Sequence, residues 1–248
     1  MALESIYISP LEQCNLHCKY CYTHKTKNIL KNKQILDFVR HYRRHIDLKS
    51  IIFCGGEVFT LRNFPRLVNK LINQDIFITI ITNGTIDKLK AIKKPQNCQL
   101  LVSFDGPKEI HDHNRGVGNF DKSVNFVHHA LKLGFPTEIF FLVTKESYPY
   151  KDSFDICGLS KTYLTDRLGS LTPDQVKDIR QNYQCYPPKN FGCSMLSLQS
   201  DAKFYGCCES TKSIGTLSDP ITQVINNYTK IVNKFPDCYD PQFHCHLT

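Results

Sequence analysis

The chain has 248 residues, of which 41% are hydrophobic, and a formal net charge of +8 at pH 7. This length allows one medium-sized domain with an appendage, and no stretch approaches the ~20 apolar residues that a membrane-spanning helix needs. The first residues carry Glu4 where a signal peptide would carry basic residues, and no hydrophobic run follows it. We therefore expect a soluble, cytoplasmic protein without a membrane partner.

The positive charges are spread along the chain, with a modest concentration between Lys19 and Arg44. A solvated helix face explains this concentration, and a surface that attracts an acidic peptide or nucleic acid is the alternative. The chain shows no base-stacking motif and no zinc-finger spacing, which disfavours nucleic acid as a partner.

Strand-like and helix-like segments alternate through the first two thirds of the chain, a pattern typical of repeated βα units around a parallel sheet. We expect strands at residues 5–11, 50–54, 76–82, 99–104, 137–144 and 162–169. We expect helices at residues 33–44, 64–74, 86–93 and 121–133, and one that begins at Thr172. The segment 146–160 is too short and too rich in Pro, Tyr and Gly for a full helix. The sequence therefore predicts an α/β fold, a partial TIM-like (β/α)6 barrel.

The pattern changes near Tyr183 to short strands, turns and cysteines. We expect a domain boundary there, with the barrel over residues 1–183. Residues 184–248 would then form a small cysteine-rich domain built on a β-hairpin.

Twelve cysteines in a chain expected in the reducing cytosol indicate metal binding rather than disulfides. Cys14, Cys18 and Cys21 follow the first expected strand, at the end where βα barrels assemble their active sites. Three thiolates on one loop can hold three irons of a 4Fe-4S cluster and leave the fourth iron open to a small molecule. The alternative is a structural zinc site that His17 or His24 completes. We expect Cys54, Cys98 and Cys157 to be small buried hydrophobic residues.

The Cys-x3-Cys-x2-Cys spacing, with Tyr20 before the last cysteine, resembles the motif that defines the radical S-adenosylmethionine (SAM) superfamily. The Phe-Cys-Gly-Gly-Glu run at residues 53–57 resembles the Gly-Gly-Glu segment of this family. Two further strand ends, at residues 82–84 and 103–107 with the segment up to Arg115, resemble radical SAM enzymes that modify peptides and proteins.

The resemblance implies that Cys14, Cys18 and Cys21 hold a 4Fe-4S cluster whose open iron binds SAM. Reduction of this cluster would yield a 5'-deoxyadenosyl radical, which abstracts a hydrogen atom from the substrate. We therefore expect an enzyme, a radical SAM oxidoreductase with SAM as cofactor.

The same resemblance implies which residues bind SAM. Glu57 would hold the methionine ammonium, Ser103 would contact the methionine or the ribose, and Tyr20 would lie beside the adenine. Gly55 and Gly56 would let the backbone approach the ligand closely. Asp105 would either contact SAM or cap the turn that follows it.

The segment 191–217 resembles the hairpin of the SPASM and Twitch extensions, which carry auxiliary 4Fe-4S clusters in peptide-modifying radical SAM enzymes. A tight turn at residues 200–203 would place Cys193 and Cys207 together. The number of cysteines favours one auxiliary cluster in a Twitch-like domain, and a second zinc site is the alternative. The expected ligands are Cys185, Cys193, Cys207 and one of Cys238 and Cys245.

Cys208 directly follows an expected ligand. Because neighbours on a strand point to opposite sides, Cys207 and Cys208 cannot serve one cluster with equal ease. Cys208 is therefore a buried filler, an exchangeable ligand, or a catalytic thiol that donates a hydrogen atom to a carbon radical.

The main functional hypothesis is modification of a ribosomally made peptide, by crosslinking or epimerisation. The alternatives are a radical SAM enzyme that acts on a small metabolite and a non-catalytic iron-sulfur protein, which the Gly-Gly-Glu segment disfavours. The expected partners are the peptide and a reducing protein such as flavodoxin or ferredoxin. A leader peptide would be bound by the barrel, the tail or a separate leader-binding protein.

Overall fold

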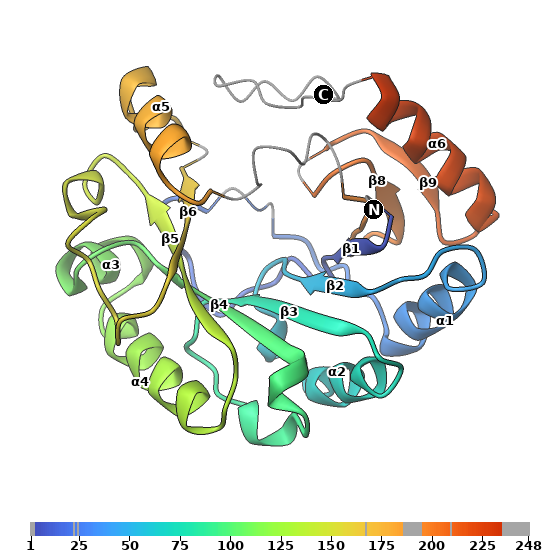
Figure 1. The fold of residues 1–248 in the computed structure, drawn as a ribbon, viewed down its shortest axis with the longest axis horizontal. Coiled ribbons are helices and arrows are strands. Elements are labelled where there is room, and N and C mark those ends of the chain that lie inside the picture. The colour runs from blue at the N-terminus through green and yellow to red at the C-terminus, as the bar shows by residue number, and fades with distance from the viewer. Residues whose placement is uncertain are drawn as a thin grey trace.

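The computed structural model describes residues 3–21, 23, 25–166, 168–185, 195–208 and 210–234. In these residues nine strands form one sheet, in the order β6-β5-β4-β3-β2-β1-β7-β8-β9. Six of them are the strands of a parallel barrel: β1 (Ser5–Ile8), β2 (Ser50–Phe53), β3 (Phe77–Thr82), β4 (Cys98–Phe104), β5 (Thr137–Val143) and β6 (Lys161–Thr165). All six lie where the sequence predicts them, and the sheet curves into an open barrel (Figure 1), so the expected fold class is confirmed.

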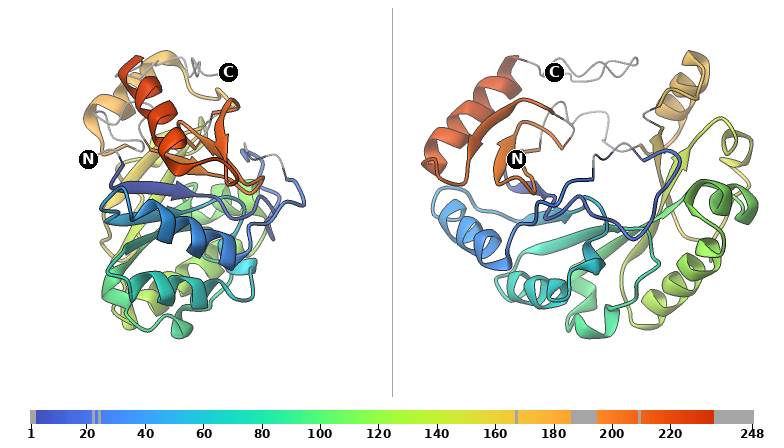
Figure 2. Two further views of the ribbon diagram at one scale, coloured as in Figure 1. Left: turned by 90° about the vertical axis from the view of Figure 1, so that its right-hand side faces the viewer. Right: turned by 180° about the vertical axis from the view of Figure 1, so that it is seen from behind.

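Helices cover the outer face of this curved sheet (Figure 1, Figure 2). They are α1 (Asn32–Tyr42), α2 (Phe64–Ile72), α3 (Lys108–Arg115), α4 (Asn119–Lys132), α5 (Pro173–Asn182) and α6 (Ile221–Lys234). α5 begins as predicted, because Thr172 accepts a hydrogen bond from the backbone of Gln175 in a capping box. None of the helices in the described residues combines the length and the apolar composition needed to span a bilayer.

The prediction of a helix at residues 86–93 is wrong. The β3–β4 connection contains two short 3-10 turns instead, η2 (Leu89–Ala91) and η3 (Pro95–Asn97). Pro95 disfavours a helical conformation in the residue before it, and the Asp87 carboxylate accepts a hydrogen bond from the backbone of Leu89. α3 in turn forms where no helix was expected.

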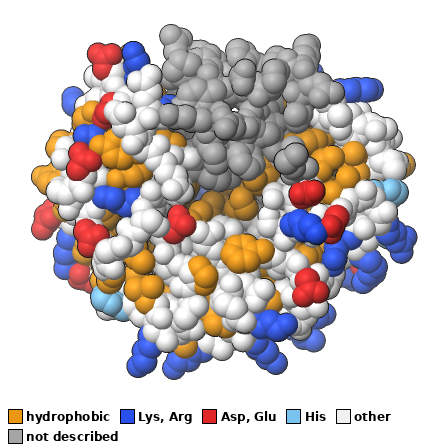
Figure 3. All heavy atoms as spheres, viewed as in Figure 1, with side chains coloured by type: hydrophobic (Ala, Val, Ile, Leu, Met, Phe, Trp, Pro, Cys, Tyr) orange, Lys and Arg blue, Asp and Glu red, His pale blue; other side chains and the backbone are white. Residues whose placement is uncertain are grey.

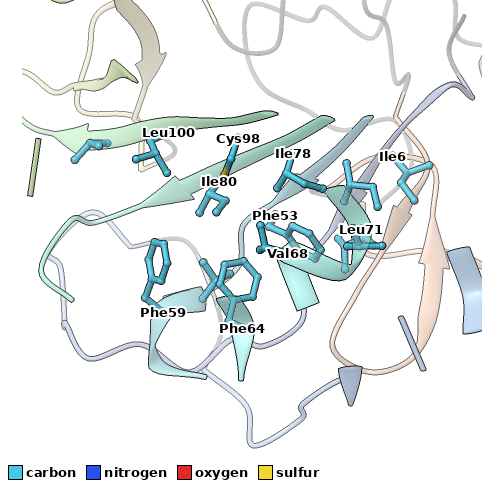
Figure 4. Packing of buried hydrophobic residues seen from close by; sticks show 14 of the residues in the cluster. Ile6, Phe53, Phe59, Phe64, Val68, Leu71, Ile78, Ile80, Cys98 and Leu100 are labelled. Carbon is cyan, nitrogen blue, oxygen red and sulfur yellow. The ribbon is translucent and has the colours of Figure 1, made fainter. Parts of the chain in front are cut away.

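Buried apolar side chains fill the space between the sheet and its helices (Figure 4). Phe64 of α2 packs edge to face against Phe53 of β2 and against Phe59, with ring centroids 5.2 and 5.5 Å apart. On the opposite face of the sheet, Ile81, Leu101 and Phe140 form a smaller cluster inside the barrel. The barrel strands are therefore apolar on both faces, as parallel strands usually are.

The expected hairpin is present and joins the barrel sheet. β7 (Ser197–Leu198) pairs in parallel with β1, and β8 (Lys203–Tyr205) runs antiparallel to β7. The turn between them holds Ala202 in the left-handed region, at φ 64°. β9 (Ser213–Thr216) completes the sheet. The domain boundary at residue 183 stays a prediction, since the sheet itself continues beyond it.

Candidate active site

A cavity lies at the carboxyl ends of the barrel strands, where the sequence predicts the active site. Its lining comes from the loop after β1 and from the ends of β2, β3, β4, β5 and β6. Most of the residues predicted to hold the first cluster and SAM line it: Cys14, Cys18, Cys21, Tyr20, Gly55, Gly56 and Ser103. The strand-end motifs therefore meet at one place in the fold.

The three thiols of the first loop face this cavity together. Cys14 and Cys18 are half-buried and Cys21 is exposed. Burial raises the pKa of Cys14 and of Cys18, and the nearby Arg115 guanidinium opposes the shift at Cys18. In the described residues no three His, Cys, Asp or Glu side chains lie close enough to hold a single metal ion. Three thiols on the wall of one cavity nevertheless fit the larger core of an iron-sulfur cluster, because thiolate is its preferred ligand.

Gly55 and Gly56 hold the cysteine loop against the end of β2. The backbone of Gly56 donates a hydrogen bond to Leu11, and that of Glu57 donates one to Gln13, at 2.9 and 3.0 Å. A Cβ atom on Gly56 would lie 1.9 Å from the Gln13 carbonyl oxygen, and one on Gly55 would lie 2.2 Å from the Leu11 carbonyl oxygen. Only glycine permits this close approach of two backbones.

Glu57 is completely buried and does not belong to the cavity wall. Its carboxylate accepts hydrogen bonds from the backbone of Phe59, the backbone of Asn83 and the hydroxyl of Thr82, at 2.8–3.0 Å. Burial raises the pKa of Glu57, and these donors oppose that shift. Glu57 therefore ties the end of β2 to the end of β3, and its contact with an ammonium group stays a prediction.

Asn83 connects this buried network to the cysteine loop. Its side-chain amide donates to Asn15 Oδ1 at 3.1 Å and lies 3.7 Å from Cys14 Sγ. Asn15 in turn donates to Thr85 Oγ1 at 2.8 Å. The sequence singled out the Thr-Asn-Gly segment at residues 82–84 but assigned Asn83 no role, because spacing does not show which side chain faces the loop.

Asp105 and Arg115 form an ion pair beneath the cavity, with Nε and Oδ1 2.7 Å apart. Asp105 is 1% exposed and does not line the cavity, whereas Arg115 lines it and is 12% exposed. Burial raises the pKa of Asp105, and the guanidinium opposes that shift. Arg115 therefore presents a fixed positive charge to the cavity, a role the sequence did not assign to it.

Tyr20 lies at the rim of the cavity. Its hydroxyl donates to the Glu146 carboxylate at 2.9 Å, and burial together with this carboxylate raises the pKa of Tyr20 to about 12. The contact fixes the ring between the cysteine loop and the β5–β6 connection.

The second group of cysteines is only partly within the described residues. The backbone of Cys185 forms an isolated parallel β-bridge with Tyr163 of β6, and the Cys185 thiol donates a hydrogen bond to the Ile179 carbonyl at 3.3 Å. Cys207 and Cys208 follow β8, and the Cys208 carbonyl accepts a hydrogen bond from Gln199. Cys193, Cys238 and Cys245 lie outside the described residues. The auxiliary ligand set therefore stays a prediction.

Cys98, Cys54 and Cys157 differ in exposure. Cys98 is buried as expected, and Cys54 is half-buried on the cavity wall. The expectation that Cys157 is buried is wrong, because it is exposed in the left-handed region, at φ 56°.

The sequence matches a known family over more than half of its length: the model of the radical SAM superfamily covers residues 8–149. A cysteine-type anaerobic sulfatase-maturating enzyme from Clostridium perfringens is 33% identical over an alignment 141 residues long, which covers 48% of this chain and 38% of the relative. A 7-carboxy-7-deazaguanine synthase from Aquifex aeolicus is 26% identical over 127 residues, 51% of this chain and 57% of the relative. The matches thus span less than two thirds of either relative.

One solved structure similar to this fold is native anSMEcpe with bound AdoMet and a Cp18Cys peptide. The TM-score is 0.75 at 20% identity, and the alignment covers 91% of this chain and 81% of that chain. At this identity the similarity concerns the fold.

We predict that Asp105→Asn lowers the free energy of unfolding by about 3 kcal/mol, because it leaves the guanidinium of Arg115 largely buried without a counter-charge. Urea unfolding followed by circular dichroism measures this change. The matched control is Asp37→Asn, which removes the partner of the exposed Lys33 and Arg40 and should change stability little. Equal effects of the two substitutions would show that the buried pair does not hold the site together.

Proposed function

The chain belongs to the radical SAM superfamily, and from this premise we propose that it is an enzyme that modifies a ribosomally made peptide. Membership implies a 4Fe-4S cluster and SAM as cofactors. The observation that carries the proposal is the cavity wall on which three thiols, two glycines, Ser103 and Arg115 meet.

Cys14, Cys18 and Cys21 would hold the SAM-binding cluster, since all three line the cavity from one loop. A reduced cluster held there would supply one electron to bound SAM, and cleavage of SAM would give the 5'-deoxyadenosyl radical that abstracts a hydrogen atom. The chain itself keeps the loop in place through the Gly56 and Glu57 backbones and surrounds the cavity with Ile81, Phe140 and Leu164, which limits access of water.

The polar residues of the cavity would bind SAM. Arg115 offers the positive charge that a carboxylate requires, and Ser103 offers a hydroxyl at the end of β4. The Tyr20 ring, whose hydroxyl is held by Glu146, would lie beside the adenine. Asp105 positions Arg115, and Glu57 either meets the ammonium of SAM or positions the strand ends around it.

Two comparisons support a peptide substrate. One relative is named as a sulfatase-maturating enzyme, and one similar solved structure contains a bound peptide as well as AdoMet. A small-molecule substrate is the second candidate, supported by the deazaguanine synthase relative. Our proposal further includes one auxiliary cluster, on ligands drawn from Cys185, Cys193, Cys207 and one of Cys238 and Cys245. It also includes a flavodoxin- or ferredoxin-type reductant, and a leader peptide that is bound by the barrel, the tail or a separate leader-binding protein.

We predict that anaerobically reconstituted protein holds about eight irons, from two four-iron clusters. Replacing Cys14, Cys18 and Cys21 together by Ala should leave about four irons and abolish formation of 5'-deoxyadenosine from SAM. Iron is measured colorimetrically, and the nucleoside by chromatography after reduction with dithionite. Cys157→Ala, the replacement of an exposed thiol outside both groups, is the control and should behave as the wild type. A triple variant that still cleaves SAM would refute the ligand assignment.

We predict that the reduced enzyme changes the mass or the chirality of a peptide encoded beside its gene, as mass spectrometry and chiral amino-acid analysis can detect. Turnover of a purine or another metabolite, without any change in such peptides, would favour the small-molecule alternative.

If the product is an epimer, the wild type should incorporate deuterium from heavy water at the inverted carbon. Cys208→Ala should cleave SAM but lose this labelled product, and an unchanged product would exclude Cys208 as hydrogen donor.

A further inference from the structure

A second hollow lies on the outside of the barrel, beside α2 and the β3–β4 connection, with a volume of about 780 Å³. It exists because that connection forms two short turns where a regular barrel would place a helix. Six Lys and Arg residues line it, and we call it the basic groove: Arg62, Arg66, Lys70, Lys88, Lys90 and Lys93. In Figure 3 such side chains gather along the lower edge of the molecule, where Figure 1 places α2 and this connection.

The positive charge of the basic groove is not neutralised within the described residues. Asp87 is the one acidic residue among those that line it, and its carboxylate is paired with His129 of α4. In the same part of the chain no carboxylate forms an ion pair with any of the six Lys and Arg residues. Several like charges around one hollow create a local positive potential that attracts an anionic ligand.

Hydrogen bonds fix the backbone of the basic groove. Asn69 of α2 donates to the Ala91 carbonyl at 2.7 Å and accepts from the backbone of Lys93 at 2.9 Å. The Lys88 ammonium donates to the Leu61 carbonyl at 3.2 Å. Because both walls are tied to each other, the backbone positions that carry these charges are set before any ligand arrives, which reduces the entropy lost on binding.

Short stretches of chain connect the basic groove to the cavity at the strand ends. Asn15 of the cysteine loop contacts Thr85, and the groove residues start two positions later at Asp87. At the other wall, Arg62 follows the Gly-Gly-Glu loop by five residues. Both walls of the groove are thus joined to the lining of the cavity by short stretches of chain.

We propose that the basic groove binds an acidic stretch of the peptide substrate and so holds the peptide while another part of it enters the cavity. This inference rests on the proposed function. Single-stranded nucleic acid is the less suitable occupant, since no Phe, Tyr or Trp lines the groove and bases bind such surfaces by stacking on aromatic rings.

The test uses the reconstituted full chain and a fluorescein-labelled peptide of ten residues that alternates Glu and Gly. Fluorescence anisotropy at low salt should show binding that weakens as salt is added, because the contacts are charge-dependent. The variant Lys70→Gln, Lys90→Gln and Lys93→Gln removes three exposed cations of the groove and should raise the Kd about tenfold. The control, Lys145→Gln, Lys177→Gln and Lys212→Gln, removes the same charge elsewhere and should leave the Kd within about twofold.

Formation of 5'-deoxyadenosine without peptide is measured on the same samples and should be equal in the groove variant and the wild type. Loss of peptide binding with intact SAM cleavage supports the proposal, whereas equal Kd values for the three proteins overturn it. Binding of a labelled oligo-dT of matched charge that is tighter than that of the peptide, and lost in the groove variant, also overturns it. Failure of SAM cleavage in the wild type contradicts the proposed function and leaves the binding result to be judged separately.

Discussion

The site depends on one backbone contact, the packing of the loop after β1 on the glycines after β2. Gly56 leaves no room for a side chain, since its Cβ position lies 1.9 Å from a carbonyl oxygen of the cysteine loop. Two backbone hydrogen bonds then fix the loop, and the path of the loop determines where Cys14, Cys18 and Cys21 lie. The glycines that the sequence places beside SAM therefore also determine where the thiols are.

Two buried carboxylates hold the strand ends next to this contact. Glu57 satisfies backbone and hydroxyl donors at the ends of β2 and β3, and Asp105 at the end of β4 holds Arg115 from α3. Removing a carboxylate from water is costly, so such groups are retained where several donors or a cation meet them. The carboxylates of Glu57 and Asp105 are buried away from the cavity, whereas the positive charge of Arg115 lies on its wall.

The sequence predicted the strands and the strand ends that carry function, because parallel strands alternate with helices and their motifs follow in order. It could not predict the direction of the side chains. Glu57 was expected at SAM, and Asp105 either at SAM or as a cap of the next turn. Both are buried and neither lines the cavity, so their contacts with SAM stay predictions, whereas Arg115 reaches the cavity from a helix that was not expected. The error at residues 86–93 has a related cause: Asn69 of α2, distant in sequence, satisfies backbone groups that a helix would otherwise satisfy. The tail ligands Cys193, Cys238 and Cys245 were predicted from resemblance and lie outside the described residues.

The most direct test of this account is to measure the iron content and the SAM cleavage of the Gly56→Ala variant. The added methyl group meets the Gln13 backbone, so we expect loss of about half of the reconstituted iron and of 5'-deoxyadenosine formation, with the far-ultraviolet circular dichroism unchanged. Gly118→Ala, even at a positive φ, adds a methyl group that meets nothing within 4 Å, and it should keep the iron content and SAM cleavage of the wild type. A Gly56→Ala variant that keeps its full iron content and cleaves SAM like the wild type would contradict the claim that this contact positions the cysteine loop.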